Sequence, residues 1–189
     1  MAGFILPQLF TAMCLPPTLT QNAGGTISGA GLIFTGTAGA VWYEARANVA
    51  VSSGKWQWET DATNISTTES WISGIKATSG TLGSTAWYNA GYTNGACFGV
   101  MDNSVKVYAA ASGAFASSIA NGSVVTHLLD LDAGTYILKK DGTSLGTMFS
   151  GISGEFAPAC QMYSSSAITY RFRSLTHPET GYSDLCAVA

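Results

Sequence analysis

The stretch that decides the fold is LLDLDAGTYILKKDGTSLGTMFSGI, residues 128–152. It places Asp130, Asp132 and Asp141 within twelve residues among glycines, as an ion-binding loop would. A calcium loop needs ligand oxygens at alternating positions over about a dozen residues. Here the apolar run from Tyr136 to Leu138 interrupts any such series. We therefore interpret the aspartates as turn residues and predict no metal site.

The same stretch predicts a chain that folds back on itself twice. VVTHLLDLD is typical of a strand, DAG of a turn in which Gly134 takes a positive φ, and TYILKK of the return strand. DG then predicts a two-residue hairpin turn, and TSLGTMF the next strand. The pattern indicates antiparallel sheet.

Strands of the same kind occur along the whole chain. GKWQWET alternates, which places Trp56 and Trp58 on one face and Lys55, Gln57 and Glu59 on the other. AITYRFR alternates in the same way. We expect such strands to bury one face and to expose the other to water. The residues predicted to form the core are Trp56, Trp58, Leu129, Leu131, Phe149, Ile168, Tyr170 and Phe172.

The repeated pattern predicts the fold class. More than ten short strands, no convincing amphipathic helix and no repeating strand–helix unit indicate an all-β protein. We predict a two-sheet antiparallel sandwich of the jelly-roll type, with an extended N-terminal arm. Leu129 and Leu131 can point inward only if His127 shares their face.

Composition limits the classes of function. Only 10% of the residues are charged, against roughly 25% in an ordinary soluble domain. The net charge is -3, and the five lysines and three arginines are scattered. No basic stripe can follow a phosphate backbone, so nucleic acid is not a predicted partner. So few charges indicate that partners cover part of the surface.

The four cysteines are far apart. Cys14, Cys97, Cys160 and Cys186 form no close pair, and no histidine lies near any of them in sequence. Structural zinc ligands usually come in close pairs. We predict free thiols and no zinc site, and no cofactor is predicted.

The N-terminal segment MAGFILPQLFTAMCLPP, residues 1–17, resembles a secretion signal only superficially. It has no basic start, Pro7 interrupts its apolar run, and the run is too short to span a bilayer. We predict an arm that anchors the protein to a neighbouring subunit; the alternative is an arm that folds back over a sheet edge of its own sandwich. The predicted contact residues are Phe4, Ile5, Leu6, Leu9, Phe10, Met13 and Leu15.

Six stretches in a fixed order resemble the SPRY domain, a concanavalin-like β-sandwich. They are SSGKWQWE, GIKA, the hairpin LLDLDAGTYILKKDG, the strands TSLGTMFSGI and GEFAPAC, and the closing AITYRFR. The resemblance gives an arm over residues 1–24, a sandwich over 25–173 and a tail over 174–189 with a short final strand. Asp141-Gly142 stands where Asn-Gly is more usual. The closing HPETGYSDLCAVA is similar to the tail that follows SPRY-like domains in bacteriophage virion proteins.

This resemblance implies binding rather than catalysis. SPRY domains generally recognise protein partners through loops at one edge of the sandwich. The expected function is that of a non-enzymatic virion structural protein, which decorates or cements a bacteriophage capsid or tail. Its expected partners are the major capsid or tail protein and further copies of itself, as a homo-oligomer or a symmetric array. The expected location is the virion, assembled in the host cytoplasm, with no membrane contact.

Three loops are candidates for the binding surface, over residues 62–70, 78–86 and 109–121. The last is small and apolar and contributes Phe115. A second hypothesis is a receptor- or glycan-binding module of a tail appendage, in which Trp87, Tyr88 and Tyr92 stack on a sugar; the alternative for these rings is the core. A third hypothesis is an intracellular peptide-binding SPRY protein.

Catalysis has weak support in the sequence. Glu59 and Asp61 share a strand face, as the paired carboxylates of related jelly-roll glycanases do, but Asn64 occupies the position of the required acid. His127 is interpreted as a strand histidine and His177 as a loop residue, with no nucleophile motif beside either. We predict no enzymatic activity and no catalytic residue.

Overall fold

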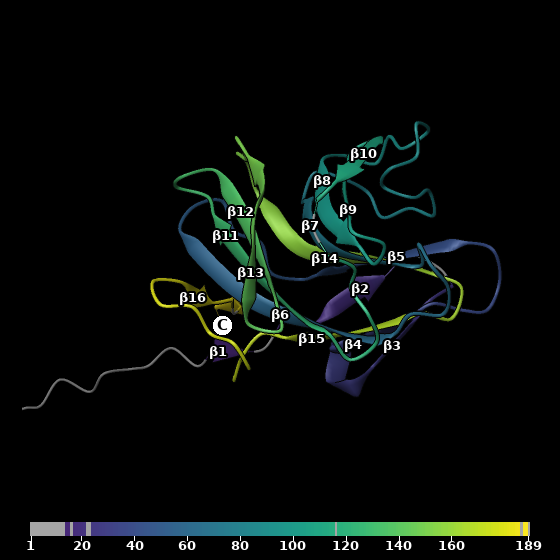
Figure 1. The fold of residues 1–189 in the computed structure, drawn as a ribbon, viewed down its shortest axis with the longest axis horizontal. Helices are drawn as coiled ribbons and strands as arrows, with labels where there is room; N and C mark the ends of the chain where they lie inside the picture. The colour runs from purple at the N-terminus through teal and green to yellow at the C-terminus, as the bar shows by residue number, and fades with distance from the viewer. Residues whose placement is uncertain (1–13, 16, 22–23, 116, 186, 189) are drawn as a thin grey trace, which may run out of the picture.

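The computed structural model describes residues 14–15, 17–21, 24–115, 117–185 and 187–188. In these residues two sheets face each other (Figure 1). Apart from one parallel pair, β16 with β6, every strand pair is antiparallel, and a three-residue 3-10 helix (Gly29–Gly31) is the only helix in the described ranges. The predicted all-β sandwich is confirmed.

The strands follow in spatial order. The seven-stranded sheet contains β10 (Ala111–Ala114), β9 (Val105–Tyr108), β8 (Cys97–Met101), β7 (Trp71–Ala77), β14 (Phe156–Tyr163), β5 (Trp42–Ala47) and β2 (Leu19–Gln21). The eight-stranded sheet contains β13 (Thr143–Ser150), β12 (Thr135–Lys140), β11 (Val124–Asp130), β6 (Lys55–Asn64), β15 (Ala167–Arg171), β4 (Ile33–Thr35) and β3 (Thr26–Ser28), with β16 (Ser183–Asp184) beside β6. A separate pair joins β1 (Cys14–Leu15) to β17 (Ala187–Val188).

The predicted hairpin turns are confirmed. Asp141 and Gly142 have φ values of 49° and 78°, and Lys140 pairs with Thr143, as in a two-residue primed turn. Gly134 has a φ of 66°, and a Cβ there would lie 2.9 Å from the carbonyl oxygen of Ile152. Both turns therefore use backbone conformations that few side chains tolerate.

The three aspartates of the opening stretch serve these turns and a neighbouring loop. The Asp130 carboxylate accepts a hydrogen bond from the amide of Ala133 at 2.9 Å. Those of Asp132 and Asp141 accept from the amides of Gly54 and Val124, each at 2.8 Å. The interpretation of these carboxylates as turn residues is confirmed.

The core lies between the two sheets. On the strand faces that point into it, buried residues alternate as predicted. Of the predicted core residues, Trp58, Leu129, Ile168, Tyr170 and Phe172 are buried. The other three are partly buried and pack against the same cluster; they are Trp56, Leu131 and Phe149.

His127 shares the inward face, as the register requires. Its ring stacks on Trp58 with centroids 5.0 Å apart. Nδ1 lies 2.6 Å from the Tyr136 hydroxyl, and Nε2 lies 2.9 Å from Thr60 Oγ1 and 3.1 Å from Ser73 Oγ. Burial lowers the pKa of His127 to about 3. The interpretation as a hydrogen-bonded strand histidine is confirmed.

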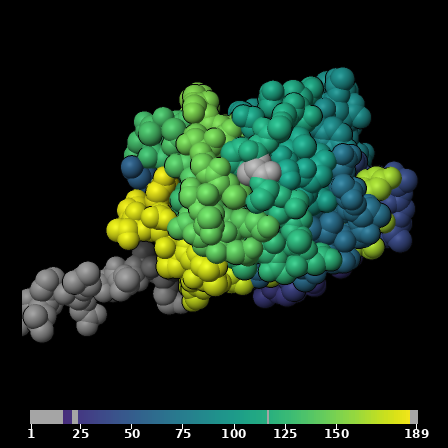
Figure 2. All heavy atoms as spheres, in the orientation of Figure 1, coloured from purple at the N-terminus to yellow at the C-terminus, as the bar shows by residue number. Residues whose placement is uncertain are grey.

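The prediction that the other face of β6 is wet is wrong for Gln57 and Glu59. Both side chains are buried, with exposed fractions of 4% and 0%. The C-terminal segment, residues 174–185, lies across them, and the amide of Glu179 donates to Gln57 Oε1 at 2.7 Å. Figure 2 shows this segment in yellow against the green strands of the eight-stranded sheet.

The outer face of the seven-stranded sheet is covered as well, by residues 78–96. Lys76 and Glu44 form an ion pair of 2.7 Å in which both side chains are fully buried. Lys76 Nζ also donates to the Thr81 carbonyl at 2.6 Å, and the indole N–H of Trp87 donates to Glu44 at 2.7 Å. This cluster holds the covering segment to β5 and β7.

Two cysteines can be placed with their side chains. Cys97 and Cys160 are buried free thiols, and burial raises the pKa of each to about 12. Cys97 packs under the 78–96 segment, whereas Cys160 lies in the core between the sheets.

The predicted arm is described only in its last part. Of its contact residues, Phe4, Ile5, Leu6, Leu9, Phe10 and Met13 lie outside the described residues, and Leu15 belongs to β1. Pro17 is buried, and Leu19–Gln21 extends the seven-stranded sheet beside β5. Among the described residues no helix is long and apolar enough to cross a bilayer.

Candidate interaction surface

Turns of both sheets converge at one end of the sandwich, which we call the loop end: residues 36–41, 65–70, 102–104, 117–123 and 164–166. Short polar side chains join them. Ser166 Oγ lies 2.8 Å from the hydroxyls of both Ser66 and Ser70. Asn64 donates to the carbonyl of Ser165 at 2.8 Å, and the Ile65 amide donates to Asn121 Oδ1 at 2.5 Å. These bonds hold the turns in fixed relation to the strands.

A hollow of about 370 Å³ opens where two of the predicted loops meet. Its lining comes from the 62–70 and 109–121 segments and from the β8–β9 turn, and includes Ile65, Asp102 and Ile119. The structure therefore brings together two of the three loops chosen from sequence. The third, residues 78–86, does not line it.

A second hollow, of about 330 Å³, lies on the other side of Thr68; we call it the aromatic trough. Its lining consists of Trp42, Thr68, Glu69, Tyr88 and Tyr163. The ring centroids of Trp42 and Tyr88 are 6.1 Å apart at an interplanar angle of 84°, and those of Trp42 and Tyr163 are 5.4 Å apart at 49°. Non-parallel rings thus surround the trough.

Glu69 lines the aromatic trough, and Asp102 holds its backbone. The buried Asp102 carboxylate accepts hydrogen bonds from the amides of Glu69 at 3.0 Å and of Ser70 at 3.1 Å. Burial raises the pKa of Asp102, although these amides oppose the change. Asn103 donates to Glu69 Oε1 at 2.8 Å, so the side chain is oriented too.

The structure corrects the stacking hypothesis for two of its three rings. Trp87 is fully buried and Tyr92 is 5% exposed, so neither can present a ring face to a sugar. Tyr88 is partly exposed and lines the trough. Phe115, predicted as a contact residue, is partly buried and packs against the core cluster. Sequence reasoning missed Trp42, Glu69 and Tyr163, which are far apart in the chain and have no shared motif.

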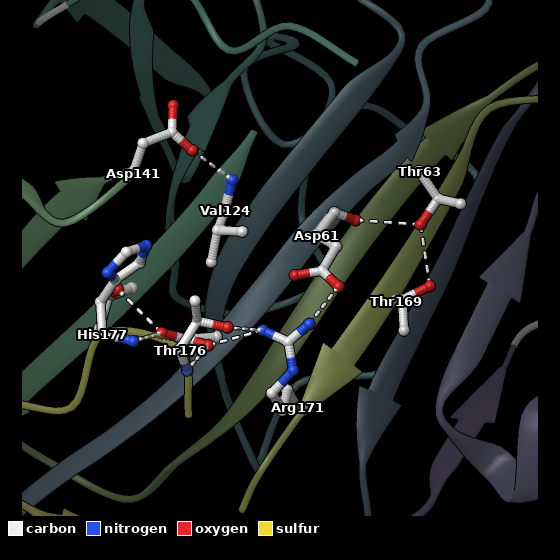
Figure 3. Close-up of polar contacts among 10 residues, drawn as sticks. Asp61, Thr63, Val124, Asp141, Thr169, Arg171, Thr176 and His177 are labelled. Atoms are coloured by element: carbon white, nitrogen blue, oxygen red, sulfur yellow. Dashed lines mark hydrogen bonds and ion pairs between the residues drawn. The ribbon is translucent and has the colours of Figure 1, made fainter. Parts of the chain in front are cut away.

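Of the two carboxylates considered for catalysis, Glu59 holds the C-terminal segment instead, and Asp61 binds Arg171. Glu59 accepts from the amides of Thr176 at 2.7 Å and His177 at 2.6 Å, and pairs with Arg171 at 2.7 Å. Arg171 also pairs with Asp61 at 2.6 Å (Figure 3), so its guanidinium joins the two carboxylates. Burial by itself raises the pKa of Glu59, but the two amides and Arg171 outweigh it and lower that pKa. This bonding pattern gives Glu59 a structural role.

A hollow of about 440 Å³ separates the same segment from β11 and β12. Leu128 and Ile137 line it from the sheet, and Tyr182 from the segment. Lys139 and Glu179 join across it in an ion pair of 2.6 Å. Like the Glu59 contacts, this pair fastens the segment to the sheet.

Replacing Glu59 by glutamine is expected to loosen this segment. The NH2 group of glutamine is a donor and would face the donor groups of Arg171, Thr176 and His177. We therefore expect the free energy of unfolding to fall by about 2 kcal/mol. Hydrogen exchange should accelerate at residues 176–185. The control is Asp61→Asn, which removes the more exposed partner of Arg171 and should have a smaller effect. Unchanged exchange protection in Glu59→Gln would contradict this role.

No family model matches the chain, and no curated protein matches it. Solved structures of SPRY domains do match. The SPRY domain of human HERC1 has a TM-score of 0.68 and 18% identity, over 80% of this chain and 94% of that chain. A human SPRY domain has a TM-score of 0.64 and 11% identity, over 83% of this chain and 98% of that chain. The PSpry domain of TRIM65 has a TM-score of 0.61 and 14% identity, over 81% of this chain and 91% of that chain. The chain therefore has the SPRY fold.

Proposed function

We propose that this chain is a non-enzymatic protein-binding module and a structural component of a bacteriophage virion, where it decorates or cements the capsid or tail. The observation that carries the binding role is the loop end, where two hollows flank Thr68 on a framework of hydrogen-bonded turns. Such concave sites on a rigid scaffold are typical of recognition surfaces. The virion role rests on the similarity of the C-terminal segment to the tails of virion proteins.

The buried polar groups support binding over catalysis. Glu59 is held by two amides and Arg171, and Glu44 by Lys76 and Trp87. His127 bonds to three hydroxyls, and burial lowers its pKa to about 3. A general base needs a pKa near the working pH and access to a substrate proton. These groups are instead committed to holding the fold.

The scarcity of apolar side chains on the surface of the sandwich supports an anchoring role for the arm. Among the described residues, Val41 and Tyr108 are the only large hydrophobic side chains that are exposed. The sandwich thus offers little apolar area for a stable assembly contact. The seven apolar side chains of the predicted arm could each contribute about 1.5 to 3 kcal/mol when buried against a partner, before the cost of association is subtracted.

The virion role is tested by quantitative mass spectrometry of purified particles. We expect the chain in a fixed stoichiometric ratio to the major capsid or tail protein, retained after washes in high salt. Its absence from intact particles, or its presence only in traces, would refute the virion role and leave the fold unaffected.

Deleting residues 2–13 is expected to release the protein from the particle without unfolding it. The deletion stops at 13 because β1 begins at Cys14 and Pro17 is buried. Thermal unfolding should stay cooperative, while co-sedimentation with particles is lost. Replacing the same residues by a Gly/Ser segment of equal length separates the apolar side chains from chain length. A truncated protein that assembles as before would show that the arm is not the anchor.

A further inference from the structure

The aromatic trough carries the negative charge of Glu69. All eight lysines and arginines lie in the described part of the chain, and none forms an ion pair with Glu69. Glu69 Oε1 accepts a hydrogen bond from Asn103, and within the described residues no donor bonds to Oε2. Asp102 adds a second carboxyl group immediately behind the loop.

The rings around Glu69 suit a cation as well. Aromatic rings attract cations through their negative faces. The rings of Tyr88 and Tyr163 lie at 84° and 49° to that of Trp42 beside Glu69, and the tyrosine hydroxyls add polar acceptors. A group that both carries positive charge and donates hydrogen bonds would therefore find complementary partners on several sides.

The backbone places Glu69 there at a cost. Its φ is 63°, in the left-handed region that favours glycine. Residues held in such conformations persist where the surroundings fix them, and they cluster at functional sites. The fixing groups are Asp102, which binds the Glu69 amide, and the hydroxyl of Ser70, which bonds to the Thr67 carbonyl and closes the turn. The carboxylate is thus presented by a rigid turn.

We propose that the aromatic trough binds a cationic side chain, lysine or arginine, presented by the protein partner. This inference rests on the proposed binding role and names the chemistry of the partner. The ammonium or guanidinium donates to Glu69 Oε2 and lies against the rings of Tyr88 and Tyr163. A quaternary ammonium has no N–H to donate, so a trimethylated lysine is expected to bind more weakly than lysine.

The test uses small probes on the whole protein. Nα-acetyl-lysine amide and Nα-acetyl-arginine amide are titrated while the indole N–H resonance of Trp42 is followed by NMR. The neutral analogues are the norleucine and citrulline amides, and the trimethyllysine amide tests the need for a donor. We expect saturable shifts with lysine or arginine, weakened by added salt, and little response to the neutral analogues.

Glu69→Gln should weaken binding of the cationic probes by at least about five-fold, the loss of one charge-assisted hydrogen bond at an exposed site. The matched control is Glu155→Gln, because Glu155 is also exposed and precedes β14 at the opposite end from Tyr163. Tyr163→Ala provides a second variant, expected to weaken binding without changing the charge. Equal binding of citrulline and arginine, or unchanged affinity in Glu69→Gln, would overturn the proposal.

The result is independent of the virion test. A protein that binds the cationic probes through Glu69 but is absent from virions would refute the virion role alone. If the protein is present in virions but its trough binds neither cationic probe, the cation site alone is refuted.

Discussion

Replacing Lys76 by methionine is expected to lower the free energy of unfolding by about 3 to 5 kcal/mol, the cost of removing one partner of a buried ion pair. The fully buried Glu44 carboxylate would lose the Lys76 ammonium, and the Thr81 carbonyl would lose a donor. Burial lowers the pKa of Lys76 and Glu44 opposes that shift, so the pair depends on both charges. Equilibrium urea denaturation at pH 7 measures the change.

Two further variants separate the pair from general packing effects. The double variant Lys76→Met/Glu44→Gln removes both charges and should recover part of the loss. Lys55→Met removes an exposed partner of Asp130 and should change stability little. If Lys76→Met unfolds at the same urea concentration as the wild type, the pair does not hold the 78–96 segment as described.

Acid is expected to destabilise the protein through His127. Burial lowers the pKa of His127 from 6.5 to about 3, so the unfolded chain binds a proton that the native ring does not. The stabilising contribution is therefore complete above pH 6.5 and is lost as pH falls towards 3. Linkage gives about 1.4 kcal/mol for each pH unit within that window.

The His127→Gln variant isolates this contribution, because the other titrating groups remain in both proteins. Urea denaturation between pH 7 and pH 4.5 should show a wild-type stability that falls more steeply than that of the variant. The difference in slope should approach one proton per molecule well below pH 6.5. Parallel curves would mean that His127 titrates equally in the folded and unfolded chains.

The sequence predicted the features that local pattern controls. Alternation in GKWQWET identified Trp56 and Trp58 as inward-facing, and Asp141-Gly142 identified the turn between β12 and β13. His127 could be assigned to the core because strand geometry links it to Leu129. These inferences need only neighbours one or two residues away.

Contacts between distant segments were beyond such reasoning. Gln57 and Glu59 looked solvent-facing because nothing near them in sequence indicates that residues 174–185 return to cover them. Lys76 and Glu44 are 32 residues apart, and neither has a neighbour that signals a buried ion pair. The trough combines Trp42, Glu69 and Tyr163, which only the strand order brings together.

The two buried thiols, Cys97 and Cys160, can report on two different opening motions of the protein. Cys97 lies beneath the 78–96 segment, so lifting that cover can uncover it while the sandwich stays closed. Cys160 lies in the cluster between the sheets, so its sulfur meets solvent only when the layers part. Thiolate is the reactive form, and with each pKa near 12 the closed protein holds almost none of it at neutral pH. The alkylation rate of Cys97 would therefore measure the rate of partial opening, and that of Cys160 the rate of complete opening. Both rates come from the same molecule, without an introduced reporter group.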